Sequence, residues 1–177
     1  MVIISNYSLE FKRDSGYFKV KSKEDVPCPI CDNELKVYGS RKRTLFKQDG
    51  SKQVLIIRRL QCKQCEVLHH ELPDVIVPYK RFESDAIESV LIADNSDSTA
   101  FPGEERTFQR LKRWFYSLHE YFEGSIRAIE ERIALAHRIE LPLYPLKRQT
   151  TGWLKSLVRH LVNSHLWLQT RSASNIL

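Results

Sequence analysis

The sequence lacks the features of several common protein classes. No apolar run reaches the roughly 18 to 20 residues of a membrane-spanning helix, and residues 1–5 do not resemble the start of a secretory signal. We therefore expect a cytoplasmic protein with no membrane association. Only 6 of 177 residues are glycine, which leaves little room for a phosphate-binding loop. Because no Ser-His-Asp order or set of metal-binding carboxylates stands out either, we expect no enzymatic activity.

The positive charge of the chain is concentrated in one segment. The chain has 28 Lys and Arg against 22 Asp and Glu, a formal net charge of +6, and 42% of its residues are hydrophobic, enough for a packed core. Residues 41–81 carry 10 basic and 4 acidic side chains, whereas residues 82–123 carry 4 and 9. An excess of positive charge favours a polyanionic partner, and here it surrounds the cysteines.

The four cysteines form the strongest motif. Cys28 and Cys31 make one C-x-x-C pair, and Cys62 and Cys65 make a second, with 30 residues between the pairs. Zn²⁺ prefers four soft ligands in a tetrahedron, and two tight turns can each supply two thiolates. The spacing therefore predicts one structural zinc ion, Zn2+, held by all four cysteines.

The residues around the cysteines must be weighed against two other interpretations, a redox motif and a metal site with a histidine ligand. A redox C-x-x-C motif would need a βαβ context, which neither pair has. His69 and His70 follow closely and could replace a ligand, but four thiolates already complete a tetrahedron. The residue after such a turn favours a left-handed backbone; glycine adopts it most readily, but the chain has Asp32 and Glu66 there.

The segment between the cysteine pairs predicts a β-hairpin. Residues 35–38 alternate like a strand, residues 54–57 are β-branched or aliphatic, and Asp49-Gly50 is a strong turn signal. With this dipeptide at the centre, Arg41 and Arg58 should lie near each other across the strands. The hairpin would then carry a ribbon of candidate nucleic-acid contacts: Arg41, Lys42, Arg43, Arg58 and Arg59. Exposed strands also carry such residues simply to stay soluble.

The second half of the chain reads as helical. A helix is expected over residues 85–93 with Ser84 as its N-cap, and another is expected to begin near Glu104. The second helix has an apolar stripe of Phe108, Leu111, Phe115, Leu118 and Phe122. Its other side carries Arg106, Gln109, Arg110 and Arg113, residue types that can read bases in the major groove. A solvated helix face is the plainer interpretation.

The C-terminal part predicts further helices. Gly124 is expected to interrupt the helical pattern, and a last helix is expected over residues 151–169, with Trp153 and Trp167 as packing residues. The fold class is thus α+β, a four-cysteine zinc ribbon followed by a helical region with a helix-turn-helix. The expected divisions are an N-terminal extension that could form a strand (1–25), the zinc ribbon (26–81), a helix-turn-helix-like unit (82–123) and C-terminal helices (124–177).

Several motifs together resemble a known family. Cys28-Pro29-Ile30-Cys31, then residues 58–65, Leu72-Pro73 and residues 77–82 resemble the zinc-ribbon front end of bacterial insertion-sequence transposases, and an uncharacterised zinc-ribbon domain family of Gram-positive bacteria. The resemblance implies that the four cysteines hold zinc and that the helix containing Arg106 to Arg113 recognises DNA. A full transposase would continue into a ribonuclease-H-like domain, but residues 125–177 read as helix.

The sequence therefore favours a non-catalytic, zinc-containing DNA-binding protein, a transposon-associated accessory factor or regulator. Its expected partner is double-stranded DNA, and a homodimer or a transposition-related protein partner is possible. One alternative is a protein-interaction module with a structural zinc ribbon, because the acidic stretch of residues 83–105 would repel DNA. Another is a binder of RNA or single strands, since zinc ribbons and basic hairpins also serve there.

Overall fold

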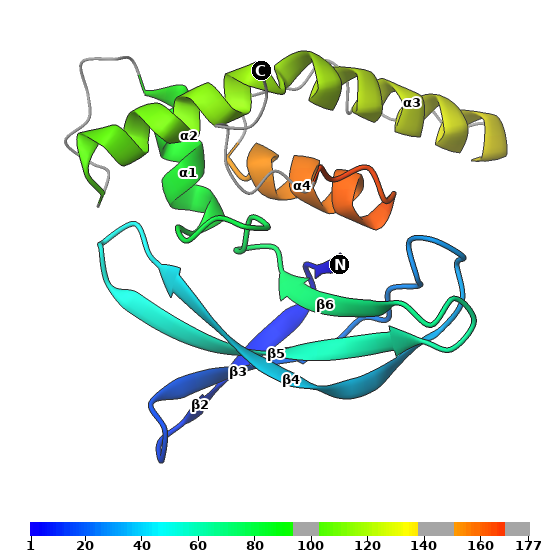
Figure 1. Cartoon of the computed structure of the whole chain (residues 1–177), viewed down its shortest axis with the longest axis horizontal. Helices are drawn as coiled ribbons and strands as arrows, with labels where there is room; N and C mark the ends of the chain where they lie inside the picture. The colour runs from blue at the N-terminus through cyan, green and yellow to red at the C-terminus, as the bar shows by residue number, and fades with distance from the viewer. Residues whose placement is uncertain (94–102, 138–150, 169–177) are drawn as a thin grey trace.

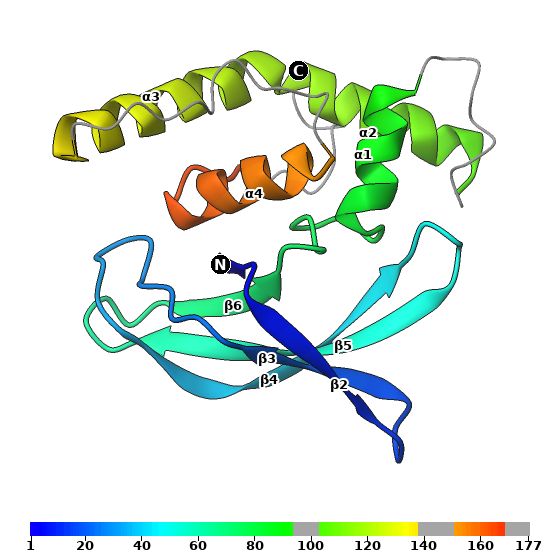
Figure 2. The same cartoon turned by 180° about the vertical axis from the view of Figure 1, so that it is seen from behind.

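The structure is a computed structural model that describes residues 1–93, 103–137 and 151–168. In this part of the chain a six-stranded, curled sheet is covered on one face by helices (Figures 1 and 2). The strands are β1 (Val2–Ile4), β2 (Tyr7–Lys12), β3 (Tyr17–Ser22), β4 (Leu35–Phe46), β5 (Lys52–Cys62) and β6 (Leu68–Pro73). The helices are α1 (Ser84–Ile92), α2 (Glu105–Ser117), α3 (His119–His137) and α4 (Trp153–Asn163).

Strand β5 is the centre of the sheet. It pairs with β4 in an antiparallel hairpin along nearly its whole length, and its other side pairs with β3 in parallel and with β6 in antiparallel orientation. Strand β2 extends the sheet beyond β3, and β1 extends it beyond β6. The N-terminal extension therefore supplies three strands, and the expected boundary between residues 25 and 26 falls within one continuous sheet.

The predicted hairpin is present, but its register differs by one residue from the expected one. The turn is a five-residue loop over residues 47–51, closed by a hydrogen bond from the Lys47 amide to the Ser51 carbonyl (2.9 Å). Arg41 therefore pairs with Ile57, and Arg58 pairs with Ser40. Because successive side chains of a strand point to opposite faces, Arg41 and Arg58 lie on opposite faces of the sheet. The expectation that they lie together was wrong.

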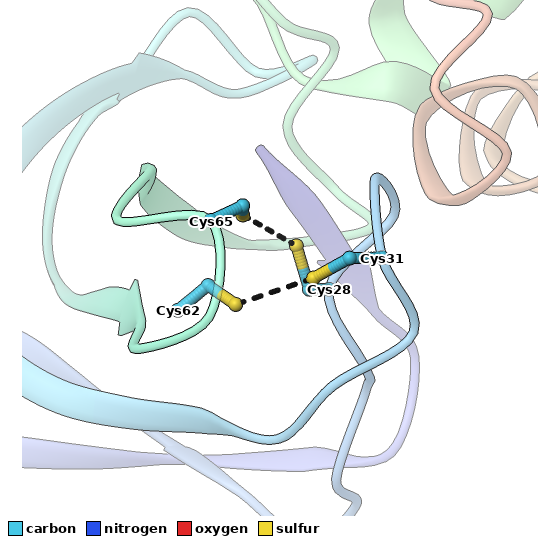
Figure 3. A group of neighbouring side chains, drawn as sticks. All are labelled: Cys28, Cys31, Cys62 and Cys65. Carbon is cyan, nitrogen blue, oxygen red and sulfur yellow. Dashed lines mark hydrogen bonds between the residues drawn. The ribbon is translucent and has the colours of Figure 1, made fainter.

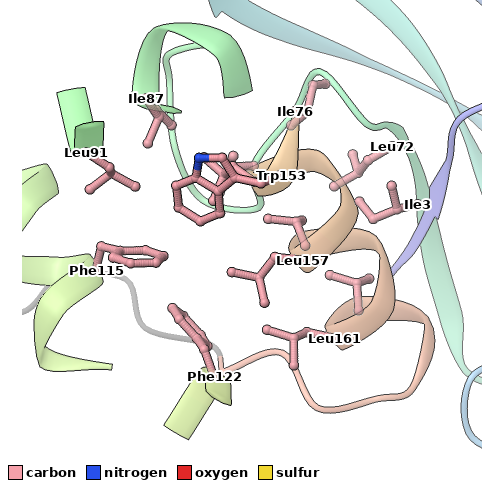
Figure 4. Packing of buried hydrophobic residues seen from close by; sticks show 14 of the residues in the cluster. Ile3, Leu72, Ile76, Ile87, Leu91, Phe115, Phe122, Trp153, Leu157 and Leu161 are labelled. Atoms are coloured by element: carbon pink, nitrogen blue, oxygen red, sulfur yellow. The ribbon is translucent and has the colours of Figure 1, made fainter. Parts of the chain in front are cut away.

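The hydrophobic core lies between the sheet and the helices, with α4 at its centre. Leu157 and Leu161 of α4 are buried between strand residues such as Ile3 on one side and Phe115 and Phe122 on the other (Figure 4). The Asn163 side chain also extends the sheet edge, because its Oδ1 accepts a hydrogen bond from the Ile3 amide (2.8 Å) and its Nδ2 donates to the Ile3 carbonyl (3.0 Å). The second half is therefore packed onto the first.

The start of α4 is capped by a carboxylate from another helix. Glu88 of α1 is only 5% exposed, and its carboxylate accepts hydrogen bonds from the amides of Gly152 (2.7 Å) and Leu154 (3.0 Å). A negative charge at a helix N-terminus satisfies free amides and is favoured by the helix dipole. Asp85 also forms an ion pair with Lys155 of α4. These acidic residues thus join α1 to α4.

The predicted helices are found with shifted ends. The apolar stripe expected on the second helix is buried throughout, and Trp153 is buried as expected. Ser84 is the first residue of α1, and Glu83 takes the N-cap position instead. The helical pattern breaks at Leu118, the C-cap of α2, while Gly124 lies inside α3. A single glycine costs a helix only about 1 kcal/mol, so packing of the stripe outweighs it.

The last helix is shorter than expected, since α4 ends at Asn163, and Trp167 beyond it stacks on Phe122 (5.7 Å between ring centroids). No described helix combines the length and apolar character required to cross a bilayer.

Candidate metal centre and basic surface

The four cysteine sulfurs converge at one end of the sheet. They come from two loops, the first knuckle (residues 28–33) and the second knuckle (residues 62–67), which face each other (Figure 3). The Sγ atoms of Cys28 and Cys65 are 3.6 Å apart, those of Cys31 and Cys62 are 3.4 Å apart, and all four lie within 4.8 Å of one another. A tetrahedral zinc centre with bonds of about 2.3 Å has sulfur–sulfur edges of about 3.8 Å. The cysteines are therefore arranged to hold a metal ion.

The two knuckles have the same backbone geometry. In the first, the Cys28 amide donates a hydrogen bond to the Asn33 carbonyl (2.9 Å), and in the second the Cys62 amide donates to the Val67 carbonyl (3.0 Å). The residue after the second cysteine of each pair has a positive φ, 56° at Asp32 and 59° at Glu66. Both positions thus adopt the left-handed conformation that is typical after such a turn, although neither residue is glycine.

Backbone amides also stabilise the thiolate form of the second cysteine in each pair. A hydrogen bond from the Asn33 backbone lowers the pKa of Cys31 to about 6. The Val67 backbone makes the corresponding bond to Cys65, but burial and the neighbouring sulfurs of Cys62 and Cys28 raise that pKa to about 12. Four thiols this close cannot all ionise without a cation, so a bound metal would complete the site.

His69 lies beside the cysteines without being needed as a fourth ligand. Its side chain is buried (1% exposed), and its Nε2 lies 3.5 Å from the Cys28 Sγ. The other ring nitrogen, Nδ1, lies 3.1 Å from the N-terminal amine. A histidine in this position can donate a hydrogen bond to a metal-bound thiolate, an interaction typical of the shell that surrounds metal ligands. His70 points to the other face of β6.

The five hairpin residues predicted to contact nucleic acid divide between the two faces of the sheet. Arg43 pairs with Leu55 and Arg41 with Ile57, and both partners are buried in the core, so these arginines lie on the helix-facing face. Arg59, two residues beyond Ile57, lies on the same face.

Lys42 and Arg58 lie on the opposite face. The Lys42 Nζ is 4.4 Å from the centre of the Tyr17 ring. Arg58 makes two hydrogen bonds to the buried carboxylate of Glu71 (2.6 and 2.5 Å), which raise its pKa. The structure therefore does not bring these two residues together with the other predicted contacts, and Arg58 has a structural partner.

Beside the helix-facing arginines lie further cations that the sequence interpretation missed. Arg43 donates a hydrogen bond from Nη2 to the Lys80 carbonyl (3.0 Å), and residues 81 and 83 pair with Phe46 at the end of β4. Burial lowers the pKa of Arg43, and the positive charges of Arg41 and Arg81 lower it further. Segment 80–83 thus brings further positive charge beside the hairpin.

Lys80 connects this group to α2. Its Nζ lies 3.9 Å from the centre of the Trp114 ring, a favourable cation–π contact. Burial lowers the pKa of Lys80 to about 8, and the charge of Arg110 also lowers it. Together these residues form what we call the basic surface: Arg41, Arg43, Arg59, Lys80, Arg81 and Arg110. Within residues 1–93, 103–137 and 151–168, none of the six forms an ion pair with a carboxylate.

The predicted contact residues of α2 are all exposed: Arg106, Gln109, Arg110 and Arg113. Arg110 lies on the side of the helix near Lys80. Gln109 and Arg113 instead line an open pocket of about 460 Å³ between α2 and the end of α1. The Gln109 amide also donates to Glu105 (2.7 Å). The structure thus brings one of the four, Arg110, near Lys80, and the others lie exposed on the same helix.

Part of the acidic segment lies away from the basic surface. Asp85 and Glu88 face α4, whereas Glu83 stays beside the hairpin, where its carboxylate accepts a hydrogen bond from the Gln48 backbone amide (2.6 Å). The sequence signal that could have located Lys80 and Arg81 is the excess of positive charge over residues 41–81. Only the pairing of segment 81–83 with β4 shows where these two cations lie.

Comparison with known proteins gives one match. A family model described as a domain of unknown function (DUF6431) matches residues 28–114, from the first cysteine of the metal centre to Trp114 beside Lys80. The matched part thus contains both knuckles, the hairpin, α1 and most of α2. No curated protein and no solved structure matches.

Proposed function

We propose that this protein is a non-catalytic, zinc-containing protein that binds double-stranded DNA through the basic surface and the exposed face of α2. The observation that carries the proposal is the basic surface itself, six cations held together without a carboxylate partner in the described parts of the chain. Repulsion among such cations raises the free energy of the unbound protein, and a polyanion relieves it. The resemblance to transposase front ends favours an accessory factor or a regulator.

In this proposal the zinc ion fixes the register of the hairpin. Leu35, just after the first knuckle, pairs with Cys62, so the metal would lie at the open end of the β4–β5 hairpin. The loop over residues 47–51 closes the other end. Because a shift of one residue would move every side chain to the opposite face, this clamp decides which arginines face the helices. The site then acts as a zinc ribbon built into a larger sheet.

Helix α2 is the proposed recognition element of a helix-turn-helix formed with α1. The two helices contact each other, and the buried stripe of α2 leaves Arg106, Gln109, Arg110 and Arg113 exposed on the other side. Arg and Gln can pair with guanine and adenine edges in the major groove, while the hairpin arginines would contact phosphates. Binding in this arrangement places the basic surface along the DNA backbone beside the helix.

The test is binding of a fluorescent DNA duplex to the zinc-loaded protein, measured by anisotropy over about 50 to 200 mM salt. Wild-type affinity should fall steeply as salt rises, because bound phosphates release counterions. The double variant Arg110→Ala/Arg113→Ala should lose about tenfold or more in affinity, as expected for lost base contacts, and should change the salt slope little, because the slope reports phosphate contacts.

The control is Arg13→Ala/Lys19→Ala, which removes the same charge from exposed positions on β3 and the turn before it. It should change the affinity by less than about twofold. Equal losses in the two double variants would show a nonspecific charge effect, and no binding by the wild-type protein at low salt would contradict the proposal.

A further inference from the structure

Tyr38 is placed on the hairpin by a β-bulge. Val37 pairs with Leu60 and Gly39 pairs with Arg59, so the register shifts between them and Tyr38 has no partner residue on β5. A bulge redirects the side chain of the extra residue and is often found next to functional sites. This irregularity lies at the end of the hairpin that joins the metal centre.

The Tyr38 ring is exposed and held from one side. The side chain is 61% exposed, an unusual burial state for a large aromatic residue, and the Arg59 guanidinium carbon lies 5.1 Å from the ring centre. This cation–π contact orients the ring and leaves its other side open to solvent. The buried Nε of Arg59 has no hydrogen-bond partner within the described structure. The pair therefore forms a fixed aromatic platform.

The platform lies at one end of the basic surface. Arg59 belongs to that surface, and the charges of Arg41 and Arg59 both act on His70, which pairs with Arg59 across the sheet. Leu68, 39% exposed, lies on the same face two residues before His70. An apolar ring bordered by cations is complementary to a nucleobase, whose π-face stacks on aromatic side chains while the attached phosphate is attracted by arginine.

We propose that Tyr38 and Arg59 form a stacking site for an unpaired nucleobase of a DNA strand that extends beyond a bound duplex. The inference rests on the proposed DNA binding and adds a second ligand element to it, a single-stranded end. The positive charge around the ring favours this occupant over an aromatic side chain of a protein, which would bring no phosphate. Because base stacking is tolerant of sequence, the site selects the structure of the DNA and not its sequence.

The test compares three DNAs with the same duplex: one blunt, one with a short thymine overhang and one with an overhang of abasic nucleotides. The abasic overhang keeps the phosphates but lacks the bases, so it separates stacking from charge. The wild-type protein should bind the thymine overhang about fivefold or more tightly than the abasic one, the factor expected for stacking of one base. Tyr38→Ala should abolish this preference, and Tyr38→Phe should keep it.

The matched control is Tyr17→Ala, which removes the other tyrosine of the sheet that contacts a cation, Lys42, on the opposite face. It should keep the preference for the thymine overhang. Equal wild-type binding of the thymine and abasic overhangs, or a preference retained by Tyr38→Ala with intact zinc content, would overturn the stacking site while leaving duplex binding intact. If the wild-type protein bound none of the three DNAs, the proposed function would be overturned as well.

Discussion

Arg58 and Arg59 are neighbours in β5, yet the two faces of the sheet give them different surroundings. Arg58 is bound by two hydrogen bonds to the buried Glu71 carboxylate. Arg59 has no carboxylate partner within the described residues and lies against the Tyr38 ring. The same side chain therefore stabilises the fold on one face and remains available for a ligand on the other. The difference shows that the strand face, and not charge alone, decides which of the two arginines is paired within the fold.

The largest change should come from disrupting the proposed zinc site, because in the proposal both faces depend on the hairpin register that it fixes. Cys62→Ser removes one ligand, and since metal binding to thiolates is also folding free energy, we expect zinc release and loosening of residues 26–81. Helices α2 to α4 should partly persist through their own core. Metal content by absorption spectroscopy and local order by hydrogen exchange would measure this. Full retention of zinc would mean that a histidine, such as His69, replaces the lost ligand.

The next largest effects should distinguish Arg58 from Arg59, one in stability and the other in DNA affinity. Arg58→Ala leaves the Glu71 carboxylate (3% exposed side chain) unpaired and should lower the free energy of unfolding by about 2 to 3 kcal/mol in urea denaturation. Arg59→Ala should leave stability nearly unchanged but reduce DNA affinity several-fold and the salt slope by about 1. A greater loss of DNA affinity in Arg58→Ala than in Arg59→Ala, with both variants folded, would contradict these separate roles of the two arginines.

A smaller effect is expected on how DNA affinity and the free energy of unfolding depend on pH, through the charge of Lys80. Its pKa in the folded protein is lowered to about 8 by burial and by Arg110, so its charge is lost as the pH rises through 8. DNA affinity should therefore decrease between about pH 7 and 9. The free energy of unfolding should rise from pH 8 towards the ordinary lysine pKa of about 10.4, since only the unfolded chain still binds the proton there.

Two variants test the assignment to Lys80. Lys80→Arg keeps the charge and should bind equally well at both ends of this pH range, whereas Lys80→Met should bind weakly at both. Anisotropy titrations at several pH values would measure the difference. An unaltered pH dependence in both variants would assign the titration to another group.

The smallest expected effect is a gain in stability at the knuckles. Glu66 and Asp32 both adopt positive φ, a conformation that costs most residues about 1 kcal/mol and glycine nothing. Glu66→Gly should raise the free energy of unfolding by roughly 0.5 kcal/mol after the greater entropy of unfolded glycine is subtracted. Asp32→Gly should gain less, because aspartate tolerates this backbone better. A higher melting temperature for Asp32→Gly than for Glu66→Gly in thermal denaturation would contradict this ranking.

Local patterns explain which features were predicted correctly. The spacing of the cysteines predicted two matched turns because the ligand distance in a knuckle is set by a few consecutive residues. The stripe from Phe108 to Phe122 predicted a buried helix face because helical periodicity is a local property. The register of the hairpin was missed because a loop of five residues and one of two place different partners opposite each other. Nothing local indicates that Glu88 would cap α4.

The sequence by itself determined the two matched pairs of cysteines, the long hairpin between them and the apolar faces of the helices, since each of these depends on residues close together in the chain. The tertiary structure decided which cations lie together. The strand register divided the hairpin arginines between two faces, and the pairing of segment 81–83 with β4 brought Lys80 against Trp114. Such distances between remote segments are set by how the core packs, and no local pattern records them.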